Sequence, residues 1–296
     1  MLTAVIGLFG ALVYGAADFY GGLAAKRLRS VLVTAVAAAT GLVVFVLAAP
    51  IVGGTWSFDA VAWGALSGLF GALSVVLLYA CLAIGPMSIL SPLTALVSAV
   101  GPMIWGLVVE GEGLGVLGYL GIAVALFAVV LVGFVPGQGA VRPSARAVLM
   151  AIGAGLAIGG FLIVLDQPAH DSGLVPLIAS RAANLAVMTT VIVVMAVLAR
   201  LRPEARGPFV PLSDAPRGMR GGVAIAIVCG VLDAAANALL LLGLRLGELA
   251  VMSVLTAMYP AGTIILAAVV LRERIAPVQW VGLALALAAG ALFALA

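Results

Sequence analysis

The sequence predicts an all-α integral membrane protein with ten transmembrane helices, arranged as two inverted five-helix repeats. The first observation is composition: of 296 residues, 65% are hydrophobic and only 8% are charged, too few charges to cover the surface of a soluble domain. The second is a set of ten apolar stretches, each close to the roughly 20 residues that a helix needs to cross a bilayer. The third is a segment near the end of the first half that almost recurs near the end of the second.

Charged residues and clusters of Pro and Gly separate the ten stretches. The first stretch ends before Lys26, the fifth before Pro136, the seventh before Arg200 and the ninth before Arg272. The run Gly41–Leu47 is apolar without the alternation of a membrane β-strand, which favours helices. The expected spans are residues 2–25, 31–52, 60–84, 87–109, 115–135, 146–166, 173–199, 221–244, 249–271 and 277–295.

The internal repeat is clearest in two apolar segments. Gly118–Leu126 resembles Gln279–Leu287, which begins 161 residues later, and Glu112 and Glu273 have the same separation. Each half holds five spans, and because five is odd the second half enters the membrane upside down, as in secondary transporters with inverted repeats. We therefore expect a first repeat at residues 1–136, a cytoplasmic linker at 137–145 and a second repeat at 146–296.

The basic residues gather at helix ends, so the formal net charge of +3 indicates topology and not a nucleic-acid-binding surface. Twelve of the 14 follow odd-numbered spans, and the positive-inside rule assigns those loops to the cytoplasm. Both termini are then expected on the non-cytoplasmic side of a bacterial inner membrane. The twelve are Lys26, Arg27, Arg29, Arg142, Arg146, Arg200, Arg202, Arg206, Arg217, Arg220, Arg272 and Arg274.

Two segments carry a resemblance to a known family. Gly85–Leu93 (GPMSILSPL) opens the fourth span, and Leu271–Gly282 (LRERIAPVQWVG) connects the ninth to the tenth. Together with Tyr259-Pro260 they resemble the drug/metabolite transporter superfamily, specifically its EamA-type ten-helix branch. The resemblance covers essentially the whole chain and is most specific in the second half. It implies a basket of ten helices around a central substrate cavity, and transport of small metabolites, amino acids, cations or drugs without ATP.

Three charged residues lie well inside the expected spans, where a charge is costly and usually faces a cavity or a partner. They are Asp18, Arg181 and Asp233. One interpretation is that they contact substrate or a coupling ion. The other is that Arg181 pairs with Asp233 or Asp18 and that this ion pair only stabilises the helix packing. Each shares its helix face with a polar companion three or four residues away. These companions are Tyr14, Asn184 and Asn237.

Two proline-containing helices are expected to be broken and to form walls of the cavity. A proline removes a backbone donor and frees a carbonyl one turn earlier, which is tolerated beside a cavity or a suitable neighbour. Pro102 lies in the fourth span and Pro260 in the related ninth span. Their polar faces carry Ser91, Thr94, Ser98 and Trp105, and Ser253, Thr256, Tyr259 and Thr263, respectively. Aromatic rings that could stack on substrate or hold a cation are Tyr14, Tyr79, Trp105 and Tyr259.

The remaining polar residues favour structural roles. Glu112 and Glu273 could couple an ion, but their positions at helix ends favour capping or, for Glu273, pairing with Arg272 or Arg274. His170 is expected to be a loop residue, and Cys81 and Cys229 to be small packing residues within helices. We therefore expect no metal, no cofactor and no catalytic residue.

The function expected from these features is secondary transport of small amphipathic metabolites by alternating access. Amino-acid export is the leading expectation, because the carboxylate and the ammonium group of a zwitterion require partners of opposite charge. The alternative is a cation, quaternary-ammonium or multidrug transporter in which aromatic rings and Asp18 or Asp233 hold the positive charge. A channel would need a ring of symmetric pore-lining groups, and an enzyme would need a set of catalytic residues. The sequence shows neither pattern, which favours a transporter. The expected partners are a small-molecule substrate, a coupling proton and membrane lipid.

Overall fold

The computed structural model describes residues 1–84, 87–133, 143–201, 218–272 and 275–296. Within these ranges the side chains of residues 79, 82–84, 87–89, 91, 92 and 218 are not described. The expected linker at 137–145 and Glu273 lie wholly or mostly outside the described residues.

The described part of the chain is helical and contains no strand, which confirms the all-α prediction. The first half holds α1 (Leu2–Ala25), α2 (Ser30–Val52), α3 (Phe58–Ile84), α4 (Met87–Val108) and α5 (Val116–Gly133). The second half holds α6 (Ala145–Asp166), the short 3-10 helix η1 (His170–Ser172), α7 (Val175–Leu201), α8 (Gly218–Leu246), α9 (Leu249–Thr256), α10 (Tyr259–Val270) and α11 (Pro277–Leu295).

The lengths and compositions of these helices are those of an integral membrane protein. Among the described residues, nine helices are long and apolar enough to cross a membrane, with α9 and α10 counted as the single span Leu249–Val270. The apolar part of α4 that can be assessed, Leu93–Val108, is shorter. The first and last predicted spans, 2–25 and 277–295, coincide with α1 and α11.

Only one of the two expected helix breaks is present. The ninth span stops at Thr256 and resumes at Tyr259, one residue before Pro260. The prediction of a break in the fourth span is wrong, because α4 runs without interruption through Pro102. A Cβ added to Gly159 of α6 would lie 2.9 Å from Cδ of Pro102, so a neighbouring helix supports the proline ring closely. Pro102 therefore removes one backbone donor without interrupting α4.

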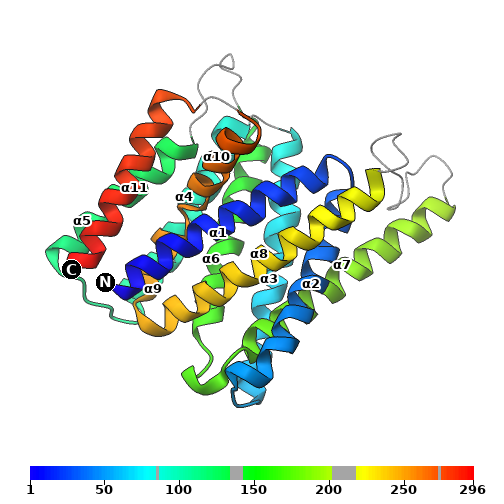
Figure 1. Ribbon diagram of the computed structural model, residues 1–296, viewed down its shortest axis with the longest axis horizontal. Coiled ribbons are helices and arrows are strands. Elements are labelled where there is room, and N and C mark those ends of the chain that lie inside the picture. Colours follow the sequence, from blue (N-terminus) through cyan, green and yellow to red (C-terminus); the bar gives the residue numbers. More distant parts are fainter. Residues whose placement is uncertain (85–86, 134–142, 202–217, 273–274) are drawn as a thin grey trace.

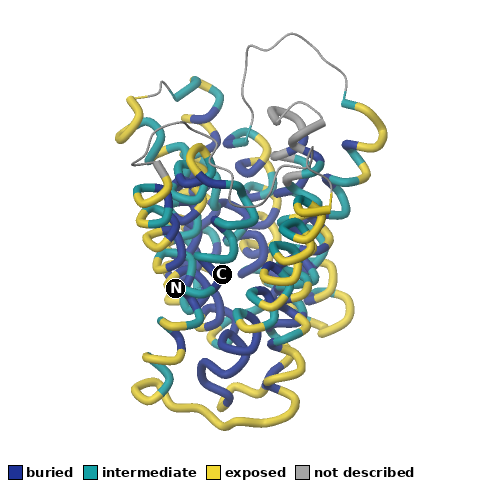
Figure 2. The backbone as a smooth tube through the Cα atoms, turned by 90° about the vertical axis from the view of Figure 1, so that its right-hand side faces the viewer, coloured by how far each residue is buried: buried dark blue, intermediate teal, exposed yellow. Residues whose placement is uncertain are grey.

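Helices of the two halves pack against each other (Figure 1). The main pairs are α1 with α8, α3 with α6, α5 with α11 and α3 with α7. Small residues permit the closest approaches: a Cβ on Gly15 of α1 would lie 2.3 Å from the carbonyl oxygen of Tyr259 in α10. Figure 2 shows buried residues in the interior of the bundle and exposed ones on its outside, the arrangement of helices that present apolar surface outward to lipid.

The bundle has two distinct ends. Both chain termini lie at one end, which we call the terminal side (Figure 1). The loops α2–α3, α4–α5, α6–α7 and α8–α9 meet there, as the hydrogen bonds of Thr55 to Asp171, Arg245 to Ser172 and Glu112 to Ala250 show. The opposite end, which we call the basic side, carries Lys26 and Arg27 after α1 and Arg220 at the start of α8. There the guanidinium of Arg27 lies beside Gly221.

Candidate functional site

A cavity of about 280 Å³ lies within the bundle, between α1, α2, α3, α6, α7, α8 and the junction of α9 with α10. It is lined by residues from both halves of the chain. Seven of the eleven predicted site residues line it: Tyr14, Asp18, Arg181, Asn184, Asp233, Asn237 and Tyr259. The structure thus brings together residues that are more than two hundred positions apart in sequence.

An ion pair forms one wall of the cavity. A guanidinium nitrogen of Arg181 lies 2.7 Å from Oδ2 of Asp233, and their side chains are 13% and 23% exposed. Asn237 donates from Nδ2 to the Asp233 carbonyl at 2.7 Å and to Oδ1 at 3.2 Å. A Cβ on Gly41 of α2 would lie 3.4 Å from Cδ of Arg181, so the absence of a side chain there leaves room for the arginine. Pairing with Asp233 was one of the two alternatives that the sequence left open.

Asp18 is the third charged residue of the cavity, and its surroundings differ. Its side chain is exposed to the cavity and has no hydrogen-bond or ion-pair partner among the described residues. Close contacts place it opposite Asp233: on α1, Gly10 lies against Leu239 and Gly21 against Cys229, and Asp18 falls between them. Because Arg181 already faces Asp233, the charged lining residues have a formal net charge of −1 that resides on Asp18.

Two buried polar atoms beside the ion pair have no hydrogen-bond partner among the described residues. These are Nε of Arg181 and Oδ1 of Asn184, which lie on the same face of α7. Asn184 is only 8% exposed and lines the cavity. Buried polar atoms normally bond to protein or to ordered water, so this wall can offer one donor and one acceptor to a water or a bound molecule.

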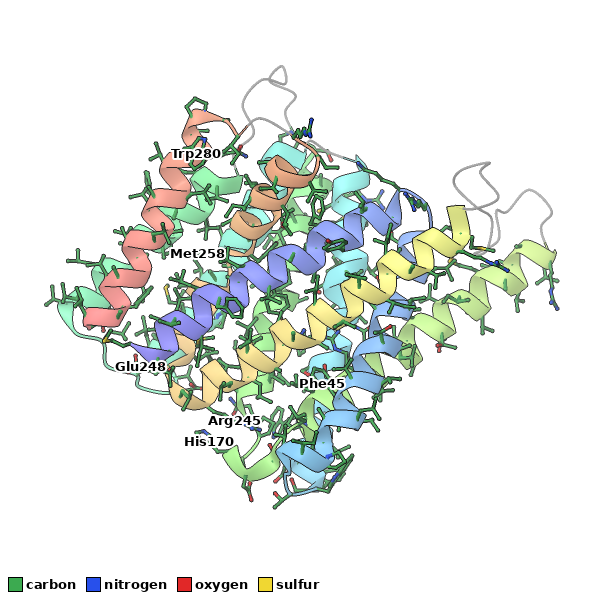
Figure 3. All side chains as sticks on the ribbon, viewed as in Figure 1. Phe45, His170, Arg245, Glu248, Met258 and Trp280 are labelled. Atoms are coloured by element: carbon green, nitrogen blue, oxygen red, sulfur yellow. The ribbon has the colours of Figure 1, made fainter. Side chains whose placement is uncertain are left out.

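Aromatic and hydroxyl groups complete the polar part of the lining. Tyr14 of α1, Phe161 of α6 and Tyr259 of α10 present rings to the cavity. Thr256, the last residue of α9, lines it beside the helix break. The carbonyl of Thr256 lacks its usual helical donor, because that donor would be the backbone nitrogen of Pro260. Met258, in the two-residue junction between α9 and α10, marks this break at mid-height of the bundle (Figure 3).

The other predicted site residues lie elsewhere or outside the described side chains. Ser98 is 3% exposed, and its hydroxyl donates to the Ala95 carbonyl at 2.8 Å within α4. Trp105 is 38% exposed near the terminal end of α4, where its Nε1 donates to Oε1 of Glu110 at 3.0 Å. Neither residue lines the cavity. The side chains of Tyr79 and Ser91 fall outside the described residues.

Sequence reasoning did not select several lining residues. Thr34, Ser74, Phe161 and Cys229 face the cavity but were not among the candidates, and Thr256 was noted only as part of a polar stripe. Ser74 and Thr34 bond to carbonyls of their own helices, which is why isolated hydroxyls in apolar helices carry little signal. For Thr256 a signal exists, since it lies four residues before Pro260.

The cavity is closer to the basic side than to the terminal side. On the basic side its lining reaches Gly22 and Thr34, each within about one turn of the end of its helix. On the terminal side an apolar cluster separates it from the helix ends. That cluster comprises Phe45, Leu162, Leu165, Leu174, Leu177, Ile178, Leu240, Leu241, Leu244, Leu249 and Met252, together with Ala234.

Beyond that cluster, loop contacts close the terminal side. Arg245, at the end of α8, donates to the Ser172 hydroxyl at 3.0 Å and to the Gly173 carbonyl at 2.7 Å. Thr55 donates its backbone N–H to the Asp171 carbonyl at 2.9 Å and its hydroxyl to Oδ2 of Asp171 at 3.0 Å. Figure 3 shows Arg245 beside the η1 segment that carries His170, and Glu248 at the same end of the molecule.

Comparisons with known proteins agree with this architecture. A solved structure, titled only as the crystal structure of a protein, is similar with a TM-score of 0.71. It is 17% identical in sequence, and the match covers 99% of this chain and 96% of that one, which shows a shared fold. No curated protein is significantly similar in sequence. The profile of the EamA-like transporter family matches residues 145–295, the half that carries the more specific resemblance. The chain therefore belongs to the EamA-like transporter family, within the drug/metabolite transporter superfamily.

Proposed function

We propose that the protein is a secondary transporter that moves small amphipathic metabolites across the bacterial inner membrane by alternating access, and that its preferred substrates carry a positively charged amine. Membership of a transporter family supports the general function. The cavity of about 280 Å³ lies at the lower end of the range for ligand pockets, which favours small substrates.

The formal charge of the cavity carries the substrate proposal. Asp18 is a carboxylate without a charged partner among the described residues, and it lies within a largely apolar bundle, where Coulomb interactions are stronger than in water. A bound ammonium group would compensate this charge and provide the hydrogen-bond donors that the carboxylate lacks. Tyr14 and Tyr259 supply aromatic faces that can hold the same positive charge or an apolar body.

Zwitterionic amino acids, the leading expectation from sequence, are the second candidate. Their carboxylate would require a cation, and Arg181 lines the cavity with one unused donor at Nε. Asp233 already occupies the guanidinium at 2.7 Å, however, so an incoming carboxylate would have to compete with it. This competition makes the ion pair a weaker attractor for anions than Asp18 is for cations.

Two features support alternating access. The first helix of each half packs against the third helix of the other half: α1 against α8, and α6 against α3. Two structurally related halves would produce this reciprocal packing. The cavity extends toward the basic side, while apolar and polar contacts close the terminal side. By the positive-inside rule the basic side is cytoplasmic, and the termini then lie on the opposite face. The same reasoning assigns residues 1–136 and 146–296 to the two repeats.

Three probes with the same phenyl group separate the substrate classes. Phenethylamine is a cation, phenylalanine a zwitterion and 3-phenylpropanoate an anion. In proteoliposomes, counterflow driven by unlabelled probe on the opposite side should be fastest for phenethylamine and absent for 3-phenylpropanoate. Asp18→Asn should abolish the phenethylamine signal, and Asp59→Asn, an exposed acidic residue at the start of α3, serves as the control. Faster exchange of phenylalanine that requires Arg181 would select the amino-acid alternative, and no exchange of any probe would reject the proposal.

A further inference from the structure

Glu112, in the loop between α4 and α5, caps a helix in the other half of the chain. Its carboxylate accepts hydrogen bonds from the backbone N–H groups of Leu249 and Ala250, the latter at 2.9 Å. These are the first two residues of α9, whose N–H groups have no acceptor within the helix. Glu248, which occupies the N-cap position of α9, makes no side-chain capping bond. The capping role that the sequence favoured for Glu112 is thus confirmed, but the capped helix lies 137 residues farther along the chain.

The surrounding backbone is shaped to hold this carboxylate. A Cβ on Gly106 of α4 would lie 2.2 Å from Oε2 of Glu112 and 3.1 Å from the backbone nitrogen of Ala250. Only a glycine leaves the slot that the carboxylate occupies. The loop folds back through a hydrogen bond of 3.0 Å from the Glu112 N–H to the Gly106 carbonyl, and Gly111 has a φ of +72°, which favours glycine.

The capped helix connects this contact to both the closed side and the cavity. Leu249 and Met252 of α9 belong to the apolar cluster beneath the terminal side, together with Phe45 of α2. At its other end α9 stops at Thr256, which lines the cavity. With eight residues and a break before α10, α9 can move as a short rigid unit about Ala257 and Met258.

We propose that Glu112 is a positioning residue for transport: its carboxylate fastens α9 to the first half of the chain while the terminal side is closed, and releases α9 when that side opens. This inference rests on the alternating access proposed above. The hydrogen bonds that Leu249 and Ala250 donate to Glu112 then belong to the closed state of the terminal side. The bonds made by Arg245 and Thr55 belong to the same state. Loss of the Glu112 bonds then weakens the whole terminal side, and not only the first turn of α9.

Hydrogen–deuterium exchange of the purified protein tests this without a substrate. In Glu112→Ala, the amides of Leu249 and Ala250 should exchange faster by about fivefold or more, the effect of losing a helix cap. The decisive amide is that of Thr55, in the loop between α2 and α3. Its N–H donates to the Asp171 carbonyl between α6 and α7, so neither partner belongs to the loop of Glu112 or to α9. It should also exchange faster if Glu112 helps to hold the terminal side closed. If Thr55 keeps its protection while Leu249 and Ala250 lose theirs, Glu112 is only a local cap and the proposal is wrong.

Two further variants test whether the faster exchange comes from the loss of the Glu112 bonds and not from any substitution near the start of α9. Gly106→Ala displaces the carboxylate without removing it, so it should accelerate the same three amides, and most of its effect should vanish in the Glu112→Ala background. Glu248→Ala removes an identical side chain one residue before Leu249 that makes no capping bond, and should accelerate none of the three. Acceleration of Thr55 by Glu248→Ala to the same extent would also overturn the proposal.

A transport measurement links the contact to function. Neither Glu112 nor Gly106 lines the cavity. In phenethylamine counterflow, Gly106→Ala should therefore change the maximal rate by about threefold or more and leave the apparent KM unchanged. An unchanged maximal rate would contradict the positioning role. Failure of the wild-type protein to exchange any of the three phenyl probes would reject the proposed function instead, and the exchange of the Thr55 amide would still decide the role of Glu112.

Discussion

Asp233 binds Arg181 at 2.7 Å on one wall of the cavity, while Asp18 faces the same space from α1 without a partner among the described residues. The two carboxylates are therefore not equivalent. Asp233 compensates a buried guanidinium and is held by Asn237, so it belongs to the framework of the site. Asp18 is free to bind a charged group that enters the cavity.

This difference predicts that the same Asp→Asn substitution affects stability strongly at Asp233 and hardly at all at Asp18. Asp233→Asn leaves the guanidinium of Arg181 largely buried without its counter-ion, which should lower the free energy of unfolding by about 3–5 kcal/mol. Asp18→Asn removes a carboxylate that pairs with no described residue and should leave stability unchanged or slightly raised. Thermal unfolding in detergent measures both. Replacing Arg181 and Asp233 together by Met and Leu should recover most of the loss, and equal effects of the two single variants would contradict the assignment.

The close contact of Gly15 with α10 predicts a large effect of a single methyl group. In Gly15→Ala the new Cβ would lie 2.3 Å from the Tyr259 carbonyl oxygen, so α1 and α10 must separate. Overpacking of this kind lowers stability by about 1–3 kcal/mol. Gly22→Ala, on the same helix, is the matched control because no atom lies within 4 Å of its Cβ. A melting temperature for Gly15→Ala at or above that of Gly22→Ala would show that this contact does not constrain the helices.

Glu248 predicts a pH dependence of stability. Partial burial, and then the nearby Glu112 carboxylate, raise the pKa of Glu248 above its ordinary value. A carboxyl group with a raised pKa in the folded state destabilises the fold when ionised, and this cost disappears as the pH falls below the pKa of the unfolded chain. Glu248→Gln should therefore be more stable than the wild type near neutral pH. The difference in melting temperature should shrink on acidification toward pH 4, near the ordinary pKa of a glutamate, and a constant difference would refute this explanation.

Thr256 predicts a change in binding without a change in stability. Its side chain lines the cavity and makes no hydrogen bond to a described residue, so Thr256→Val should shift stability by no more than about 0.5 kcal/mol. Loss of a hydroxyl that can contact substrate should weaken phenethylamine binding by about threefold to tenfold. Ligand-induced thermal shifts measure the affinity. Thr190→Val, at an exposed position of α7 outside the cavity, should leave the shift unchanged.

Helices and their limits could be predicted from sequence because local chemistry fixes them. The end of α1 before Lys26 and the start of α11 at Pro277 follow from residues at those positions. Pro102 and Pro260 show the limit of such reasoning. Both are prolines in related spans, yet only the second accompanies a break, so the presence of a proline in the sequence does not decide whether its helix is interrupted.

The same limit applies to the candidate site. Asp18, Arg181 and Asp233 could be selected from sequence because charges are rare in apolar helices, and all three line one cavity. Which carboxylate meets Arg181 depends on how α7 and α8 pack, which composition does not specify. Trp105 could not be placed because helix periodicity gives the face of a residue but not its depth, and its depth puts it beside Glu110 near the terminal side.

The interleaving of the two halves has a consequence for biosynthesis. The principal partner of α1 is α8, so α1 stays in the lipid without that partner until α8 has been synthesised and inserted. During that interval Asp18 has no α8 beside it, and the newborn helix must tolerate an acidic group facing hydrocarbon or solvated by a local water defect. Assembly is therefore completed late, when the second half arrives.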